Sequence, residues 1–325
     1  MTRFYLAPME GITGYVYRNA YAKFYGNIDK YFTPFISPGE HKCYKSRELR
    51  DVLPENNTGL NVTVQMLTNN AAHFLHTAGK LKEFGYKEVN LNLGCPSGTV
   101  VAKGRGSGFL AYPDRLDEFL DTVFEGVDKI GIALSVKTRL GRDDENEFYK
   151  LLEIYNKYPL SELIIHPRIQ KDMYKNSPRM DFFKYALEQS VNPVVYNGDI
   201  FSAGRYKEFV EDFPQVNTIM LGRGIIANPG LIDYITTGSA LDRRRLADFY
   251  DELVSNYLKE IQGEKNVMFK MKELMFYLVN IFVERDVYWK KFKKADNLSE
   301  LVYILQNMIA DGEMIPDKDF IPLFF

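Results

Sequence analysis

Short apolar segments of strand length alternate with helical patterns along most of the chain, and this alternation limits the folds available to it. We expect strands at residues 3–7, 31–35, 61–66, 88–93, 133–138, 162–166, 193–197 and 217–221. Helical patterns lie between most of them, at residues 15–25, 70–84, 114–129, 145–158, 182–189, 203–212 and 225–236. Eight such strands favour a closed parallel α/β barrel, the (β/α)8 TIM barrel. An open doubly wound sheet is the alternative, but no G-x-G-x-x-G follows the first strand.

The alternation stops after about residue 238, and three helical patterns follow at residues 242–262, 267–283 and 298–310. Small and polar residues collect at 236–242, as is typical of a domain boundary. The sequence therefore predicts a barrel domain at residues 1–238 and a small all-helical domain at residues 239–325.

Charge and cysteine content exclude several classes of protein. The 41 basic and 43 acidic residues nearly cancel, so a nucleic-acid site has to be local. The most apolar stretch, at residues 274–283, is about half the length that crosses a bilayer, and the N-terminus lacks the apolar core of a signal peptide. Two cysteines, Cys43 and Cys95, cannot build a disulfide framework. We therefore expect a cytoplasmic protein and no membrane segment.

Polar residues cluster at the C-terminal ends of the predicted strands, where catalytic groups of this barrel type lie. They are Glu10, Gln65, Asn92, Cys95, Lys137, Arg139, His166, Asn197, Asp199 and Arg223. The period of two places Asn90 and Asn92 on one face, and Lys137 on the same face as Ser135. Any one of these residues alone is equally compatible with an exposed rim position. Their agreement across six strand ends favours a shared site.

Two glycine-bearing turns, Asn197-Gly198-Asp199 and Gly222-Arg223-Gly224, follow the seventh and eighth predicted strands. In this fold that is the usual place for a phosphate, held by backbone N–H groups and a helix N-terminus. Arg223 offers a bidentate contact as well. Each turn alone is explained by ordinary turn chemistry. As a pair, the turns favour a phosphate.

Cys95 lies on a predicted loop just past the fourth strand, between Gly94 and Pro96. A buried core cysteine is the common alternative. The glycine-rich stretch at residues 103–108, with two basic residues, instead favours a reactive thiol on a mobile loop. There is no C-x-x-C pair, and His73 with His76 supplies two possible ligands without a third, so we predict no metal.

Five motifs resemble the dihydrouridine synthases of the FMN-dependent bacterial type. These are A-P-M-E-G-I-T at residues 7–13, N-L-N-L-G-C-P at 90–96, S-V-K-T-R-L-G at 135–141, N-G-D-I at 197–200 and I-M-L-G-R-G at 219–224. Members of this family reduce a uridine in RNA, generally tRNA, with NADPH as the expected reductant. The motifs occur in order through nearly the whole barrel, and the set is highly specific.

The resemblance implies a role for each matched residue. Cys95 corresponds to the acid that protonates uracil C5, while the flavin delivers hydride to C6. Asn92, Arg139 and Tyr174 match positions that contact the uracil or its ribose. The residues implied for FMN are Pro8, Met9, Glu10, Gln65, Lys137, His166, Asn197, Gly198, Asp199, Gly222 and Arg223.

The residue types suit this chemistry. Lys137 would stabilise negative charge on the reduced flavin. A thiol, with an unperturbed pKa of about 8.5, suits proton transfer to the opposite face of a uracil that has left its stack. One departure concerns the expected loop after the sixth strand, where His166-Pro167-Arg168 replaces the family's H-G-R or H-A-R, and proline removes a backbone N–H.

The predicted helical domain carries a local basic segment. Residues 265–294 hold eight Lys or Arg and three Asp or Glu, with aromatic residues interleaved. A solvated helical face is the alternative, and the family resemblance favours RNA binding, by Lys270, Lys272 and Lys291 among others. We expect a monomer with no obligate protein partner.

Two other functions stay open from the sequence. An FMN barrel acting on a free pyrimidine, of the dihydroorotate dehydrogenase type, would share the phosphate turns and the loop cysteine. A catalytically silent RNA-binding protein would bind no flavin. The sequence does not indicate which uridine is modified, whether the RNA is transfer or ribosomal, or how NADPH ranks against NADH.

Overall fold

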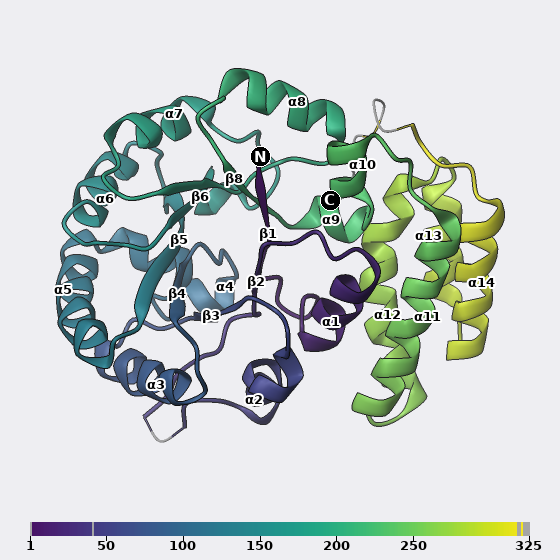
Figure 1. Cartoon of the computed structure of the whole chain (residues 1–325), viewed down its shortest axis with the longest axis horizontal. Helices are drawn as coiled ribbons and strands as arrows, with labels where there is room; N and C mark the ends of the chain where they lie inside the picture. Colours follow the sequence, from purple (N-terminus) through teal and green to yellow (C-terminus); the bar gives the residue numbers. More distant parts are fainter. Residues whose placement is uncertain (1, 41, 317–319, 321–325) are drawn as a thin grey trace. The chain divides into compact units, whose positions relative to one another are not determined.

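The structure is a computed structural model that describes residues 2–40, 42–316 and 320. It confirms the barrel, because eight parallel strands close on one another in sequence order (Figure 1). The strands are β1 (Arg3–Leu6), β2 (Lys30–Phe32), β3 (Val62–Met66), β4 (Glu88–Leu93), β5 (Ala133–Gly141), β6 (Leu163–Ile169), β7 (Val194–Tyr196) and β8 (Thr218–Leu221). A hydrogen bond of 2.8 Å from Arg3 N to Asn217 O links the start of β1 to the residue before β8.

Helices follow most strands, as the alternation predicts. They are α1 (Tyr15–Phe24), α2 (Ser46–Val52), α3 (Ala71–Glu83), α4 (Gly98–Val101), α5 (Pro113–Ile130), α6 (Glu147–Tyr155), α7 (Met180–Gln189), α8 (Ala203–Asp212), α9 (Arg223–Ala227) and α10 (Leu231–Thr237). Helix α5 shows why its sequence is helical. Pro113 occupies the first turn, and Gly131 ends the helix at a φ of 70°, where its N–H donates to Val127 O. Leu116, Leu120 and Val123 form its buried stripe.

The structure differs from the expected elements at several places in the barrel. Strand β5 continues to Gly141, three residues beyond its predicted end, β2 ends at Phe32, and helices α2 and α4 were not expected. The predicted helix at residues 225–236 is two helices, α9 and α10, because Pro229 lacks an N–H and the preceding Asn228 is extended at φ −127° and ψ 91°. The sixth strand continues through Pro167 to Ile169, three residues beyond its predicted end. The expected loop that begins at His166 is therefore partly strand.

The described chain forms two compact units. Unit 1 comprises residues 1–11, 29–198 and 216–220, and it contains nearly all of the barrel sheet. Unit 2 comprises residues 12–28, 199–215 and 221–325. It holds α1 and α8–α10 together with α11 (Arg243–Glu260), α12 (Glu264–Leu278), α13 (Arg285–Lys294) and α14 (Leu298–Asp311). Three short 3-10 helices in unit 1 and one in unit 2 complete the elements: η1 (Pro54–Asn57), η2 (Gly106–Ala111), η3 (Gln170–Asp172) and η4 (Val279–Ile281).

The C-terminal region is all-helical, as predicted, with one helix more than the sequence patterns indicated. Helix α13 was not expected, because its only buried residue is Phe292 and its apolar periodicity is correspondingly weak. Inside unit 2 the ring of Phe249 on α11 meets the rings of Tyr17, Tyr21 and Tyr25 at 5.5–6.4 Å, which packs α1 against α11. Within the described residues, every helix is too short or too polar to traverse a bilayer.

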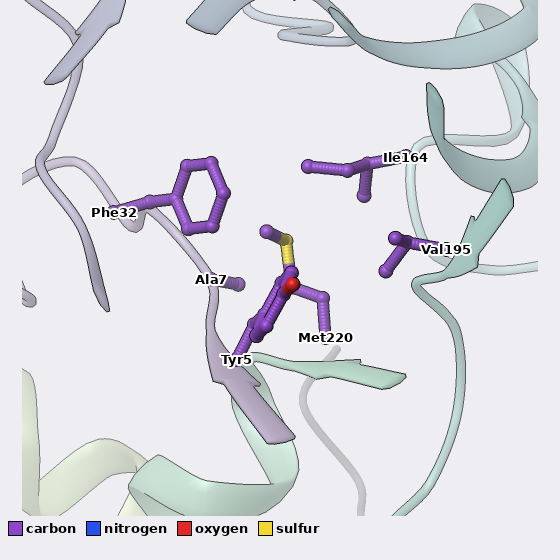
Figure 2. Close-up of a cluster of buried hydrophobic side chains, with 6 residues drawn as sticks. All are labelled: Tyr5, Ala7, Phe32, Ile164, Val195 and Met220. Atoms are coloured by element: carbon purple, nitrogen blue, oxygen red, sulfur yellow. The ribbon is translucent and has the colours of Figure 1, made fainter. Parts of the chain in front are cut away.

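One side of the barrel interior is filled by apolar side chains from five strands and their ends. Figure 2 shows them gathered around a common centre, and each is at most 4% exposed. The members are Tyr5, Ala7, Phe32, Ile164, Val195 and Met220, which we call the apolar lining. Their burial follows from the alternation of inward and outward side chains along each strand.

Candidate active site

Cys95 lies on a loop that is held from two directions. On one side, Asn92 Oδ1 accepts hydrogen bonds from Gly94 N at 3.0 Å and from Cys95 N at 2.9 Å. On the other, Ser107 donates to Cys95 O through its hydroxyl at 2.8 Å and its backbone N–H at 3.1 Å. The neighbouring Gly106 has φ +56°, and a Cβ there would lie 2.8 Å from Cys95 O. The glycine-rich stretch therefore braces the cysteine instead of leaving it on an unattached loop.

The thiol of Cys95 is a protonated group near neutral pH. Burial raises its pKa, and this outweighs the opposite effects of a backbone hydrogen bond from Ser97 and of the positive charges of Arg139 and Lys137. The side chain is only partly buried, so it is accessible to a reactant. A neutral and accessible thiol suits proton donation better than it suits thiolate nucleophilic attack.

Lys137 on β5 is a partly buried ammonium group whose Nζ makes no hydrogen bond or ion pair among the residues that the structure describes. Burial, and then the positive charge of Arg139, lowers its pKa to about 7. It pairs in register with Asn92 and interacts electrostatically with Cys95. Leaving such a group without an acceptor is costly, so the position fits a ligand that brings negative charge or carbonyl oxygens.

Arg139 connects the cysteine loop to the end of β6. Its Nε donates to Gly94 O at 2.9 Å and its Nη1 donates to Ile169 O at 3.0 Å. Its guanidinium lies 5.3 Å from the ring centre of Tyr174, which is 41% exposed, while Arg139 itself is 1% exposed. The arginine therefore holds two loops together, in addition to the substrate contact that the sequence predicts for it.

His166 stacks on Tyr174, with ring centres 5.9 Å apart and planes at 28°. Arg168 Nη1 lies 2.8 Å from His166 Nε2. Because a guanidinium can only donate, Nε2 is the acceptor and the ring proton sits on Nδ1. The sequence pattern predicts no role for Arg168 itself, although its place two residues after His166 puts both on the same side of the continued strand.

The residues that follow β1 differ in exposure. Pro8 and Met9 are partly buried, whereas the Glu10 side chain is 52% exposed and pairs with Arg47 at 3.2 Å. Gln65, by contrast, is fully buried and bonded to both Asn90 and Asn92 at 2.7 Å. Unit 1 thus brings together Gln65, Asn92, Cys95, Lys137, Arg139, His166 and Tyr174.

The turns after β7 and β8 contact each other within unit 2. Arg223 Nη2 lies 2.9 Å from Asp199 Oδ1, and its guanidinium lies 5.2 Å from the ring centre of Phe201. A Cβ on Gly224 would lie 2.3 Å from Ile200 O, so only glycine permits this approach. In unit 1, Asn197 Nδ2 donates to Met220 O at 2.8 Å, and Gly198 packs against the Tyr196 side chain. Gly222 is the N-cap of α9.

The three lysines predicted to bind RNA have different surroundings in unit 2. Lys270 pairs with Glu273 at 3.0 Å, and Lys272 donates to Lys293 O at 3.2 Å and to Ala295 O at 2.8 Å. Lys272 therefore caps the C-terminal end of α13. Lys291 lies 5.3 Å from the ring centre of Tyr288.

Comparison with known proteins gives a family and supports the fold. A family described as dihydrouridine synthase (Dus) matches residues 5–310. The tRNA-dihydrouridine synthase B of Pasteurella multocida is 27% identical over 286 residues, which cover 86% of this chain and 84% of that protein. The tRNA-dihydrouridine(16) synthase of Shewanella oneidensis is 26% identical, covering 94% of this chain and 97% of that protein. Morphinone reductase in complex with tetrahydroNAD superposes with a TM-score of 0.53 at 12% identity, over 74% of this chain and 88% of that chain, and shares the barrel fold.

The family match spans almost all of the chain, and the five motifs that first indicated it fall at strand ends of a closed barrel. The chain belongs to the dihydrouridine synthase family.

Proposed function

We propose that this protein reduces a specific uridine of tRNA to 5,6-dihydrouridine with FMN as its cofactor. Family membership and the names of the two related tRNA-dihydrouridine synthases support the reaction and the substrate. The observation that carries the proposal is the Lys137 ammonium, which has no acceptor among the residues that the structure describes and interacts electrostatically with the neutral thiol of Cys95. A cation and an acid at one end of a barrel fit an anionic cofactor and a ring that needs a proton.

The residues present fit FMN. The charge of Lys137 suits the electron-rich ring system, and Gln65 and His166 supply further polar groups, with Pro8, Met9 and Glu10 after β1. For the phosphate we propose the two turns, with Asn197, Gly198, Asp199, Gly222 and Arg223. When bound, FMN supplies hydride to C6 of the uracil, and NADPH is the proposed reductant that restores it.

Cys95 is the proposed acid, because burial keeps its thiol protonated at the pH where a proton must be given to C5. Asn92 and Arg139 hold the loop that carries the thiol, and both lie at the site together with Tyr174. We propose that Tyr174, whose ring is exposed over the Arg139 guanidinium, contacts the uracil or its ribose. The uracil has to leave its stack to reach these groups.

The C-terminal residues 239–325 are proposed to bind the RNA, with the basic segment at 265–294 as the contact surface. Among the three lysines, Lys291 carries most of this expectation, because the ammonium groups of Lys270 and Lys272 already serve an ion pair and a helix cap. We further propose that the protein acts as a monomer in the cytoplasm.

The test uses purified protein, NADPH and tRNA taken from cells that lack the gene, with dihydrouridine detected by mass spectrometry. Wild type should restore the modified uridine, and Cys95→Ala should bind FMN and accept electrons from NADPH yet form no product. Cys43→Ala removes the other thiol of the chain and serves as the matched control. Full product formation by Cys95→Ala would remove that residue from the mechanism, and turnover of free uracil or orotate without RNA would contradict the proposed substrate.

A further inference from the structure

A continuous chain of hydrogen bonds crosses the barrel interior along β3, β4 and β5. Ser135 Oγ donates to Glu88 Oε1 at 2.6 Å, and Asn90 Nδ2 donates to Ser135 Oγ at 2.9 Å. Gln65 Nε2 donates to Asn90 Oδ1 at 2.7 Å, and Asn92 Nδ2 donates to Gln65 Oε1 at 2.7 Å. We call these five residues the polar chain. Its two ends lie at opposite ends of β4, because Glu88 begins this strand and Asn92 stands one residue before its last.

The direction of every hydrogen bond in the polar chain is set at both ends. At one end the Glu88 carboxylate can only accept, and Lys30 holds it as an ion pair at 2.9 Å while also pairing with Glu162 at 2.9 Å. At the other end the backbone N–H groups of Gly94 and Cys95 can only donate, so Asn92 must turn its carbonyl oxygen toward them. Between these ends, the Ser135 hydroxyl and the amides of Asn90 and Gln65 can meet both requirements only when each donates toward the Glu88 end and accepts from the Asn92 end.

This arrangement determines what Asn92 offers to a reactant. Its oxygen already accepts two hydrogen bonds. One hydrogen of its amide group is donated to Gln65, and the second has no acceptor among the described residues. Asn92 is therefore held as a hydrogen-bond donor, which suits a carbonyl oxygen of a pyrimidine and not a ring N–H. Reversing its amide would set oxygen against oxygen at Gln65 and would leave the N–H groups of the cysteine loop without their acceptor.

We propose that Glu88, Ser135 and Asn90 are positioning residues, which fix the amide orientation of Gln65 and Asn92 and thereby the place of the Cys95 loop. None of the three is at the reacting end of the barrel, and they act through the groups that are. This inference deepens the proposed function and rests on it for its catalytic consequence. Its structural consequence, the hold on the loop N–H groups, stands independently.

The main variant is Ser135→Ala, which removes the two hydrogen bonds nearest the Glu88 end of the polar chain. Thr138→Val is the matched control, because Thr138 lies on the same strand and its buried hydroxyl bonds Arg139 O at 2.9 Å and Tyr155 at 3.0 Å, outside the polar chain. Both substitutions delete one buried hydroxyl of β5, so thermal unfolding shows how far each perturbs the fold as such.

Two measurements separate positioning from a merely structural role. Amide hydrogen exchange at Gly94 and Cys95 should be about tenfold faster in Ser135→Ala and unchanged in Thr138→Val, because only the first loosens the acceptor Asn92. Turnover of tRNA should fall about tenfold in Ser135→Ala with the KM for tRNA unchanged, as expected when a transition-state contact is lost. In an Asn92→Ala background, Ser135→Ala should have little further effect on turnover, since its effect acts through Asn92.

Unchanged exchange at Gly94 and Cys95 in Ser135→Ala would overturn the inference, whatever the enzyme does with tRNA. Equal losses of turnover in Ser135→Ala and Thr138→Val would overturn its catalytic part. If exchange changes as expected but wild type forms no dihydrouridine, the proposed function fails while the polar chain keeps its role in holding the loop.

Discussion

The two sides of the barrel interior are both largely buried and differ in chemistry. The apolar lining fills the side formed by β1, β2 and β6–β8, while the polar chain runs along β3–β5. Burying an apolar side chain of this size contributes about 1.5–3 kcal/mol to folding, whereas a buried hydrogen bond contributes about 1 kcal/mol net and is costly when left unmade. The apolar lining therefore stabilises the barrel. The polar chain gives up some stability in exchange for fixed hydrogen-bond directions at Gln65 and Asn92, near the cysteine loop.

Removing the thiol on the loop that the polar chain holds should produce the largest change. We expect Cys95→Ala to lower dihydrouridine formation about 10³-fold, within the range for loss of a general acid, and to leave the melting temperature nearly unchanged. Single-turnover measurements with reduced enzyme and tRNA, alongside calorimetry, give both values. A large loss of stability with normal turnover in Cys95→Ala would contradict the comparison, in which the apolar lining stabilises the fold and the polar chain serves catalysis.

The opposite pattern is expected for the apolar lining. Phe32→Ala should lower the free energy of unfolding by about 3–5 kcal/mol, because it opens a cavity under a fully buried ring. Turnover of the folded, flavin-loaded enzyme should change far less. Denaturant unfolding and steady-state rates measured on the same preparation test this. A fall in turnover as large as that in Cys95→Ala would contradict the expected difference between the two sides.

Lys137 should leave a signature in the pH dependence of stability of the ligand-free protein. Its pKa is about 7 in the fold against an ordinary value of 10.5, so between these values the unfolded chain binds a proton that the folded protein does not. Relative to Lys137→Met, wild type should gain up to about 1 kcal/mol of unfolding free energy per unit as pH rises above about 7. Urea unfolding of both proteins across this pH range measures the gain. Parallel profiles of unfolding free energy against pH for wild type and Lys137→Met would show that Lys137 keeps its proton in the fold.

The smallest effect is expected outside the barrel, where neither side of its interior is involved. Lys291→Glu should weaken RNA binding and reduce the slope of binding against salt concentration by about 1, without changing stability. Lys272→Ala should instead lower the melting temperature, because it uncaps α13. An unchanged salt slope in Lys291→Glu would count against the basic segment as an RNA contact.

Much of the architecture could be predicted because it depends on local pattern. The period of two and the flanking helical patterns indicated eight strands, and the bounds of β4 agree residue for residue with the prediction. Helix α13 escaped prediction because its apolar pattern is weak, and the division into α9 and α10 because Pro229 was passed over within a continuous helical pattern. The site residues at strand ends were identifiable for the same local reason, since parallel strands bring those ends to one edge.

Partners across the barrel could not be predicted in this way. The alternation places Asn90 and Ser135 on inward faces, yet only the register of β4 against β5 shows that they are opposite each other. The use of Arg139 to tie the cysteine loop to the end of β6 likewise depends on segments distant in sequence.

By itself, then, the amino-acid order determined which segments are strands, which side chains face inward and where the thiol, the cation and the glycine turns stand along the chain. Closure of the sheet decided which inward groups meet and that a carboxylate at the start of β4 is linked to the loop of Cys95. It also left the Lys137 ammonium without an acceptor in the described part of the chain. The physical reason is that side-chain period is a property of one strand, while hydrogen-bond partners and burial depend on how neighbouring strands are staggered.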